Sequence, residues 1–211
     1  MKKILSLIQK SWIKINAKRR KKDLKATNFT IISNNCWAEK IYKSYDMEYL
    51  TPTIGCFIMP EDFIRFCKQI EFYLNEELVE IEFNNSKYKD FFILNKEGYK
   101  KYGKYPIGII DDVEIHFLHY SSFDEAKKKW DRRKKRVNLN KIFFKLNDQN
   151  GCTFDDYIQF QTIPQKSKIF FSSKNGWGIQ IVKSRDLEYR DEPYGKSRKF
   201  NVTKYINGVV E

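Results

Sequence analysis

The stretch Tyr105–Arg136, YPIGIIDDVEIHFLHYSSFDEAKKKWDRRKKR, contains two short apolar runs, an acidic pair between them and a basic segment after them. The runs Ile107–Ile110 and Val113–His119 are typical of strands, because they are short and rich in β-branched residues. In the sequence Ser-Phe-Asp-Glu, the serine is followed three residues later by a glutamate. This spacing is that of a capping box and predicts the start of a helix. The stretch therefore predicts strand, turn, strand and helix in succession.

Strand-type and helix-type segments alternate on both sides of this stretch. The other expected strands are Phe29–Ser33, Ile54–Met59, Val79–Phe83, Lys141–Leu146, Lys168–Ser172 and Ile179–Lys183. The other expected helices are Trp37–Tyr45, Pro60–Leu74 and Thr153–Thr162. Such alternation with short links favours a layered α/β domain, with a largely parallel or mixed central sheet and helices on its faces. We expect a single domain of this kind over residues 26–211.

The positive charge is concentrated in two segments. The chain carries a formal charge of +13, of which residues 1–25 supply +9 and residues 127–136 supply +7, leaving −3 for the rest. A slightly acidic body argues against a nucleic-acid surface across the domain. Two local basic segments instead favour contacts with lipid head groups, phosphates or a partner protein.

Residues 1–25 predict a separate basic amphipathic helix. Its apolar arc contains Ile4, Trp12 and Ile15, with lysines on the opposite side. Such a helix either lies in a membrane interface or docks on protein, and the pattern is compatible with both. No apolar run approaches the length of a membrane span, and the four cysteines lack a CxxC spacing. We expect a cytoplasmic protein that associates with the inner face of the membrane if residues 1–25 bind lipid.

Polar residues follow the ends of several expected strands, where ligands bind in open parallel sheets. They comprise Asn34, Asn35, His119, Asp148, Ser172 and Lys174. We predict catalytic roles for the two asparagines, His119 and Asp148, and ligand binding for Ser172 and Lys174. The alternative for each residue taken alone is that its side chain only forms hydrogen bonds within a turn or at a helix cap.

The acidic turn and the basic helix suggest two further roles. Asp112 and Glu114 could hold Mg²⁺ or Mn²⁺, since hard cations prefer carboxylate oxygens, although the pair also fits a hairpin turn. Arg132 and Arg133 lie among eight Lys and Arg residues in ten positions, and predict phosphate binding. The alternative is that these residues lie there only because positive charges are favourable near the C-terminus of a helix.

Six separated segments carry a family resemblance. They are FTIISNNCW, TPTIGCFIMPEDFIRF, YPIGIIDDVEIHFLHY, AKKKWDRRKKR, NDQNGCT and KIFFSSK, in this order within residues 20–185. Together they resemble a bacterial exopolysaccharide-biosynthesis family built on the domain of unknown function numbered 1919. The resemblance implies a role in making capsule or another surface polysaccharide, and it implies no catalytic residues.

We therefore expect a transferase of surface-polysaccharide assembly that acts on a nucleotide-activated sugar or a phosphorylated group. The alternative is a non-catalytic binding or scaffolding protein of the same assembly, which uses the two basic segments for membrane or partner contact. Nucleic-acid binding is the least favoured expectation, because the body of the chain is net acidic.

Overall fold

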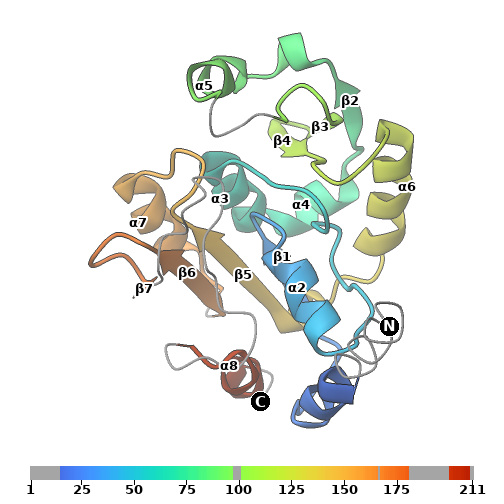
Figure 1. Ribbon diagram of the computed structural model, residues 1–211, viewed down its shortest axis with the longest axis vertical. Helices are drawn as coiled ribbons and strands as arrows, with labels where there is room; N and C mark the ends of the chain where they lie inside the picture. The colour runs from blue at the N-terminus through green and yellow to red at the C-terminus, as the bar shows by residue number, and fades with distance from the viewer. Residues whose placement is uncertain (1–14, 97–100, 166, 181–199, 210–211) are drawn as a thin grey trace, which may run out of the picture.

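The computed structural model describes residues 15–96, 101–165, 167–180 and 200–209, which form two sheets surrounded by helices (Figure 1). The strands are β1 (Thr30–Ser33), β2 (Val79–Ile81), β3 (Ile107–Ile110), β4 (Val113–His116), β5 (Ile142–Asn147), β6 (Lys168–Ser172) and β7 (Ile179–Gln180). The α-helices with assigned bounds are α2 (Trp37–Ser44), α3 (Pro60–Lys68), α4 (Ile70–Asn75), α5 (Lys89–Leu94), α6 (Phe123–Lys134), α7 (Phe154–Thr162) and α8 (Val202–Val209). The mixed α/β class predicted from the sequence is confirmed.

The larger sheet is parallel and has the order β1-β5-β6-β7. One of its faces packs on α3, α4, α6 and α7 through a core that includes Phe63, Trp130 and Phe160. The other face packs on α2 and α8 through a second core that includes Tyr42 and Ile206. Because helices cover both faces, all residues of β1 and β5 and nearly all of β6 are buried, as is usual for parallel strands.

The smaller sheet is antiparallel, with the order β2-β3-β4, and lies with α5 at one end of the molecule (Figure 1). Asp111 begins the turn between β3 and β4 with a φ of 51°, a left-handed conformation that aspartate tolerates in turns. The acidic pair is thus a hairpin turn, as the alternative interpretation of the sequence had it. Side chains of β3 and β4 join the core that contains α3.

Several expected elements were wrong in detail. Ile54–Met59 forms no strand: Gly55 turns the chain with a φ of 74°, and only Phe57 forms an isolated bridge, with His116. The expected helix Pro60–Leu74 is divided at Gln69 into α3 and α4. The strand expected to reach His119 ends at His116.

The basic N-terminal segment packs on the domain where it is described. Residues 15–22 are helical, whereas residues 1–14, which carry most of the predicted amphipathic helix, lie outside the described residues. Ala17 is buried, and Nε of Arg20 donates to the carbonyl of Ser44 at 2.7 Å. The amide of Lys25 donates to Oδ1 of Asn207 on α8 at 2.9 Å. Within the described part of the chain, no helix has the length and apolar character that a membrane crossing requires.

Candidate functional site

The carboxyl ends of β1 and β5 bring together a buried polar cluster. Nδ2 of Asn34 donates to Oδ1 of Asn147 at 2.9 Å. Lys145 is completely buried on β5, and its Nζ donates to Oδ1 of Asn34 at 3.3 Å and to Oδ1 of Asn35 at 3.0 Å. The two asparagines that the sequence predicted for this edge are therefore adjacent, and a lysine that was not predicted joins them.

The neighbouring end of β6 continues this cluster. Oδ2 of Asp148 accepts from the hydroxyl of Ser172 at 3.1 Å, and from the amide and hydroxyl of Ser173 at 2.8 and 2.9 Å. The amide of Lys174 donates to the hydroxyl of Ser172 at 2.9 Å. The residues predicted after β1, β5 and β6 thus meet at one edge, as expected for parallel strands.

A cleft of about 500 Å³ lies between α3 and α7, next to the loop that leads from β5 into α7. It is bounded by one side of α3 along its whole length, by the first half of α7, and by Tyr88 and Phe91 at the start of α5. Arg65 and Lys68 of α3 line one side, while Tyr88 and Phe91 contribute aromatic rings. Clefts of this size, with aromatic surface and a few polar groups, are typical of small-molecule sites.

The N-terminus of α7 is shaped by its own cap. Oγ1 of Thr153 accepts from the amide of Asp156 at 3.1 Å, and the carboxylate of Asp156 accepts from the amide of Thr153 at 2.8 Å. This reciprocal pair is the capping box that orients the first turn of the helix. Asn150 and Gly151, just before the cap, have φ values of 56° and 74° and turn the chain into the cleft wall.

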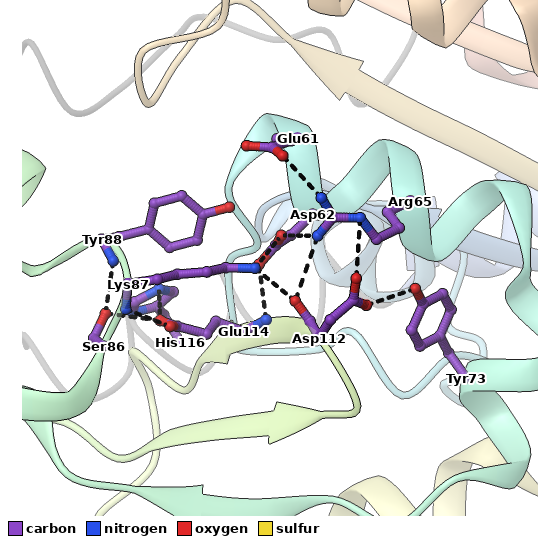
Figure 2. A network of polar contacts seen from close by, with 10 residues as sticks. All are labelled: Glu61, Asp62, Arg65, Tyr73, Ser86, Lys87, Tyr88, Asp112, Glu114 and His116. Atoms are coloured by element: carbon purple, nitrogen blue, oxygen red, sulfur yellow. Dashed lines mark hydrogen bonds and ion pairs between the residues drawn. The ribbon is translucent and has the colours of Figure 1, made fainter.

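Asp62 anchors the opposite wall from inside α3 (Figure 2). Its carboxylate is fully buried and accepts from Nη1 of Arg65 at 3.0 Å and from Nζ of Lys87 at 2.7 Å. Its other oxygen accepts from the amide of Glu114 at 2.8 Å. Burial raises the pKa of Asp62, and the hydrogen bond from Lys87 opposes that rise. The network fixes α3 and the antiparallel sheet relative to each other.

Asp112 and Glu114, the predicted metal ligands, belong to the same network (Figure 2). Asp112 accepts from the hydroxyl of Tyr73 at 2.8 Å and lies 3.2 Å from Nε of Arg65. Glu114 accepts from the hydroxyl of Ser86 at 2.7 Å and from the amide of Lys87 at 2.6 Å. Among the described residues, no group of three or more His, Cys, Asp or Glu side chains is arranged to hold a metal ion. The metal role remains a prediction, and the oxygens concerned already have protein partners.

Three predicted site residues lie elsewhere. His119 is exposed in the loop after β4, a strand of the antiparallel sheet, and its amide donates to the carbonyl of Gly55 at 3.0 Å. Arg132 is exposed on α6, whereas Arg133 is buried and bonds Tyr120. Neither these three residues nor the predicted residues at the sheet edge line the cleft; the latter are Asn34, Asn35, Asp148, Ser172 and Lys174.

The comparison with known proteins places this chain in a family. A family model described as a domain of unknown function (DUF1919) matches residues 7–189. The chain belongs to the DUF1919 family. An uncharacterized protein of Haemophilus influenzae is 32% identical over 152 residues, which cover 71% of this chain and 65% of that relative.

The DUF1919 match includes both the cluster at the sheet edge and the residues of the cleft. Sequence reasoning missed Lys145, Tyr88 and Phe91. A lysine within the otherwise apolar run of β5 was a usable signal for the first, because buried lysines require polar partners. The two aromatic residues gave no such signal, since they reach the cleft from a segment distant in sequence.

Gly151 offers a test of the cleft wall. A Cβ at this position would lie 2.9 Å from Cε2 of Phe91, and the φ of 74° disfavours any side chain. We expect Gly151→Ala to reduce the free energy of unfolding by about 1–2 kcal/mol, as measured by urea denaturation. Gly208→Ala is the matched control: it enters open space on α8 and should leave stability equal or slightly higher. Equal destabilisation of both variants would contradict this description of the wall.

Proposed function

We propose that the protein is a transferase of bacterial surface-polysaccharide assembly that binds a nucleotide-activated sugar or another phosphorylated donor in the cleft beside β5. The observation that supports this most strongly is that the cleft includes the loop that follows the carboxyl end of β5, a strand of the parallel sheet. Open α/β sheets bind their ligands at this end of their strands. The polysaccharide setting rests on the resemblance of the six sequence segments to the exopolysaccharide-biosynthesis family.

The chemistry of the cleft suits such a donor. Tyr88 and Phe91 provide aromatic surface for a sugar ring or a nucleobase. Lys68 is exposed at the end of α3, where its ammonium group can reach a phosphate. Arg65 is engaged by Glu61, Asp62 and Asp112, and we assign it to holding the wall rather than to ligand contact. Asn34 and Asp148 would then shape the sheet edge next to the donor.

Thermal shift with a panel of nucleotide sugars and sugar phosphates, with and without Mg²⁺ or Mn²⁺, tests the proposal. We expect one donor class to raise the melting temperature in a saturable manner. Lys68→Ala should weaken binding of that donor about tenfold, the effect of losing one charge-assisted contact. Lys128→Ala changes an equally exposed lysine on α6 and should bind as the wild type does. The proposal fails if no donor binds, or if both variants bind equally.

A scaffolding role is the second candidate, favoured by the exposed basic side of α6. Lys128, Arg132 and Lys135 are exposed and make no ion pair or side-chain hydrogen bond with another described residue. A partner surface of opposite charge would find three cations available there. This candidate predicts that replacing all three with glutamine abolishes association with assembly proteins and leaves donor binding unchanged.

A further inference from the structure

Arg133 is a buried cation that forms no ion pair with any residue the structure describes. Its side chain is on α6, and only 6% of the residue is exposed. Nη1 donates to the hydroxyl of Tyr120 at 2.7 Å, which is its one hydrogen bond among the described residues, and Nε has no partner. No described carboxylate lies within ion-pair distance of it. Buried charges in proteins are normally paired, because leaving water without compensation is costly.

Neighbouring cations differ from Arg133 in this respect. Lys129, one turn earlier on α6, pairs with Glu125 at 2.5 Å. Arg136, at the end of the same helix, pairs with Glu48 at 2.6 Å. On α2, Glu39 is held by Lys43, and both lie close enough to influence Tyr49. The nearby carboxylates are therefore paired with other cations. Glu39 lies close enough to influence Tyr120, as Arg133 does, but it forms no ion pair with Arg133.

Two tyrosines hold the guanidinium in place. The hydroxyl of Tyr120 accepts from Arg133 and donates to the carbonyl of Ile54 at 2.5 Å, so both of its hydrogen-bonding roles are filled. Burial raises the pKa of Tyr120 to about 12, so its hydroxyl stays neutral and supplies no compensating charge. The ring of Tyr49 lies 5.1 Å from the guanidinium carbon and covers one face. The guanidinium is thus held at one edge by Tyr120 and on one face by Tyr49. Its remaining N–H groups donate to no residue in the described part of the chain.

We propose that Arg133 binds a phosphate group between α6 and the segment 49–55, with Tyr120 as the positioning residue. A guanidinium with free N–H donors matches the oxygens of a phosphate. A phosphate is favoured over a carboxylate because its second negative charge is matched by the basic residues of this helix. Arg133 does not line the cleft beside β5, so this site is independent of the proposed donor site.

The test uses the full chain with ¹⁵N-labelled arginine. Inorganic phosphate and glucose 1-phosphate are titrated separately at an ionic strength kept constant with sodium chloride. We expect the Nε–Hε resonance of Arg133, assigned by its loss in Arg133→Lys, to shift saturably and the melting temperature to rise. Tighter binding of the sugar phosphate assigns the site to a substrate phosphoryl group, and equal binding assigns it to free phosphate.

Variants distinguish phosphate binding at Arg133 from binding in the cleft and from nonspecific attraction by positive charge. Arg133→Lys should weaken phosphate binding at least about tenfold, because an ammonium group cannot reproduce the planar set of N–H donors of a guanidinium. Tyr120→Phe, a conservative change, should also weaken phosphate binding, because it removes the hydrogen bond that positions Arg133. This variant tests the proposal even if Arg133→Lys does not fold. Arg132→Lys, at the exposed neighbouring position, should bind phosphate as the wild type does. In Lys68→Ala, which changes the cleft, the Arg133 resonance should shift as it does in the wild type. An unmoved Arg133 resonance, or equal losses in Arg132→Lys and Tyr120→Phe, would overturn the proposal.

Discussion

Replacing Asp62 with alanine should lower the free energy of unfolding by about 1–3 kcal/mol, the usual cost of leaving a buried hydrogen-bond donor without its partner. The carboxylate is fully buried and holds Arg65, Lys87 and the amide of Glu114 at 2.7–3.0 Å. Its loss leaves that amide unsatisfied and removes the link between α3 and β4. Urea denaturation at neutral pH measures the change.

Glu61→Ala is the matched control for this prediction. Glu61 is the preceding residue of α3 and also pairs with Arg65, at 2.8 Å, but its side chain is 68% exposed. Exposed pairs contribute little, so we expect a loss below about 1 kcal/mol. A loss for Asp62→Ala no larger than the loss for Glu61→Ala would show that the buried network does not join the two parts of the fold.

The parallel sheet was the most predictable part of the fold. β6 has the bounds expected from its apolar run, and β5 is displaced by one residue. Both strands are buried on two faces, so the apolar local sequence and the buried tertiary environment favour the same structure. The helix expected from Thr153 to Thr162 is confirmed as α7 for a similar reason, because the capping box that starts it acts within a single helical turn.

The errors arose where distant contacts override local pattern. Ile54–Met59 is apolar because it crosses between the two cores and contacts both α3 and His116. It resembles a buried strand in composition, but Gly55 turns the chain. The helix α8 follows residues 181–199, which lie outside the described residues, and its sequence was not recognised as helical.

The sequence predicted which candidate site residues lie together only where it also predicted the direction of the strands that precede them. Asn34, Asn35, Asp148 and Ser172 meet because β1, β5 and β6 run parallel, which the alternation of elements had indicated. His119 was placed with them on the assumption that its strand belonged to the same sheet. Its strand is instead part of a hairpin, which a turn of two aspartates permits and sequence spacing alone does not exclude.

His116→Leu should remove a large part of the acid sensitivity of the protein. His116 is completely buried, and neither ring nitrogen has a hydrogen-bond partner among the described residues. Its ring stacks on Phe57 with centroids 4.5 Å apart, and Nε2 lies 3.8 Å from Glu114, too far for a hydrogen bond. Burial, reinforced by the charge of Lys87, lowers the pKa of His116 to about 3.

The sign of the effect follows from the two protonation states. Between the ordinary pKa of histidine and about pH 3, the unfolded chain binds a proton that the folded chain excludes. Acidification through this range therefore favours unfolding, by about 1.4 kcal/mol for each pH unit. From pH 7 to pH 4 the wild type should lose about 3 kcal/mol more than His116→Leu.

Urea denaturation of both proteins at four pH values between 7 and 4 measures this difference. At neutral pH the variant should stay within about 1.5 kcal/mol of the wild type, because leucine removes two unpaired polar atoms while losing the ring contact with Phe57. His119→Gln changes the exposed histidine and should keep the wild-type pH dependence. If the curves of the wild type and His116→Leu run parallel from pH 7 to pH 4, His116 is not excluded from protonation by the fold. If they diverge as expected, the aromatic surroundings of this residue keep a neutral imidazole beside the acidic network of α3.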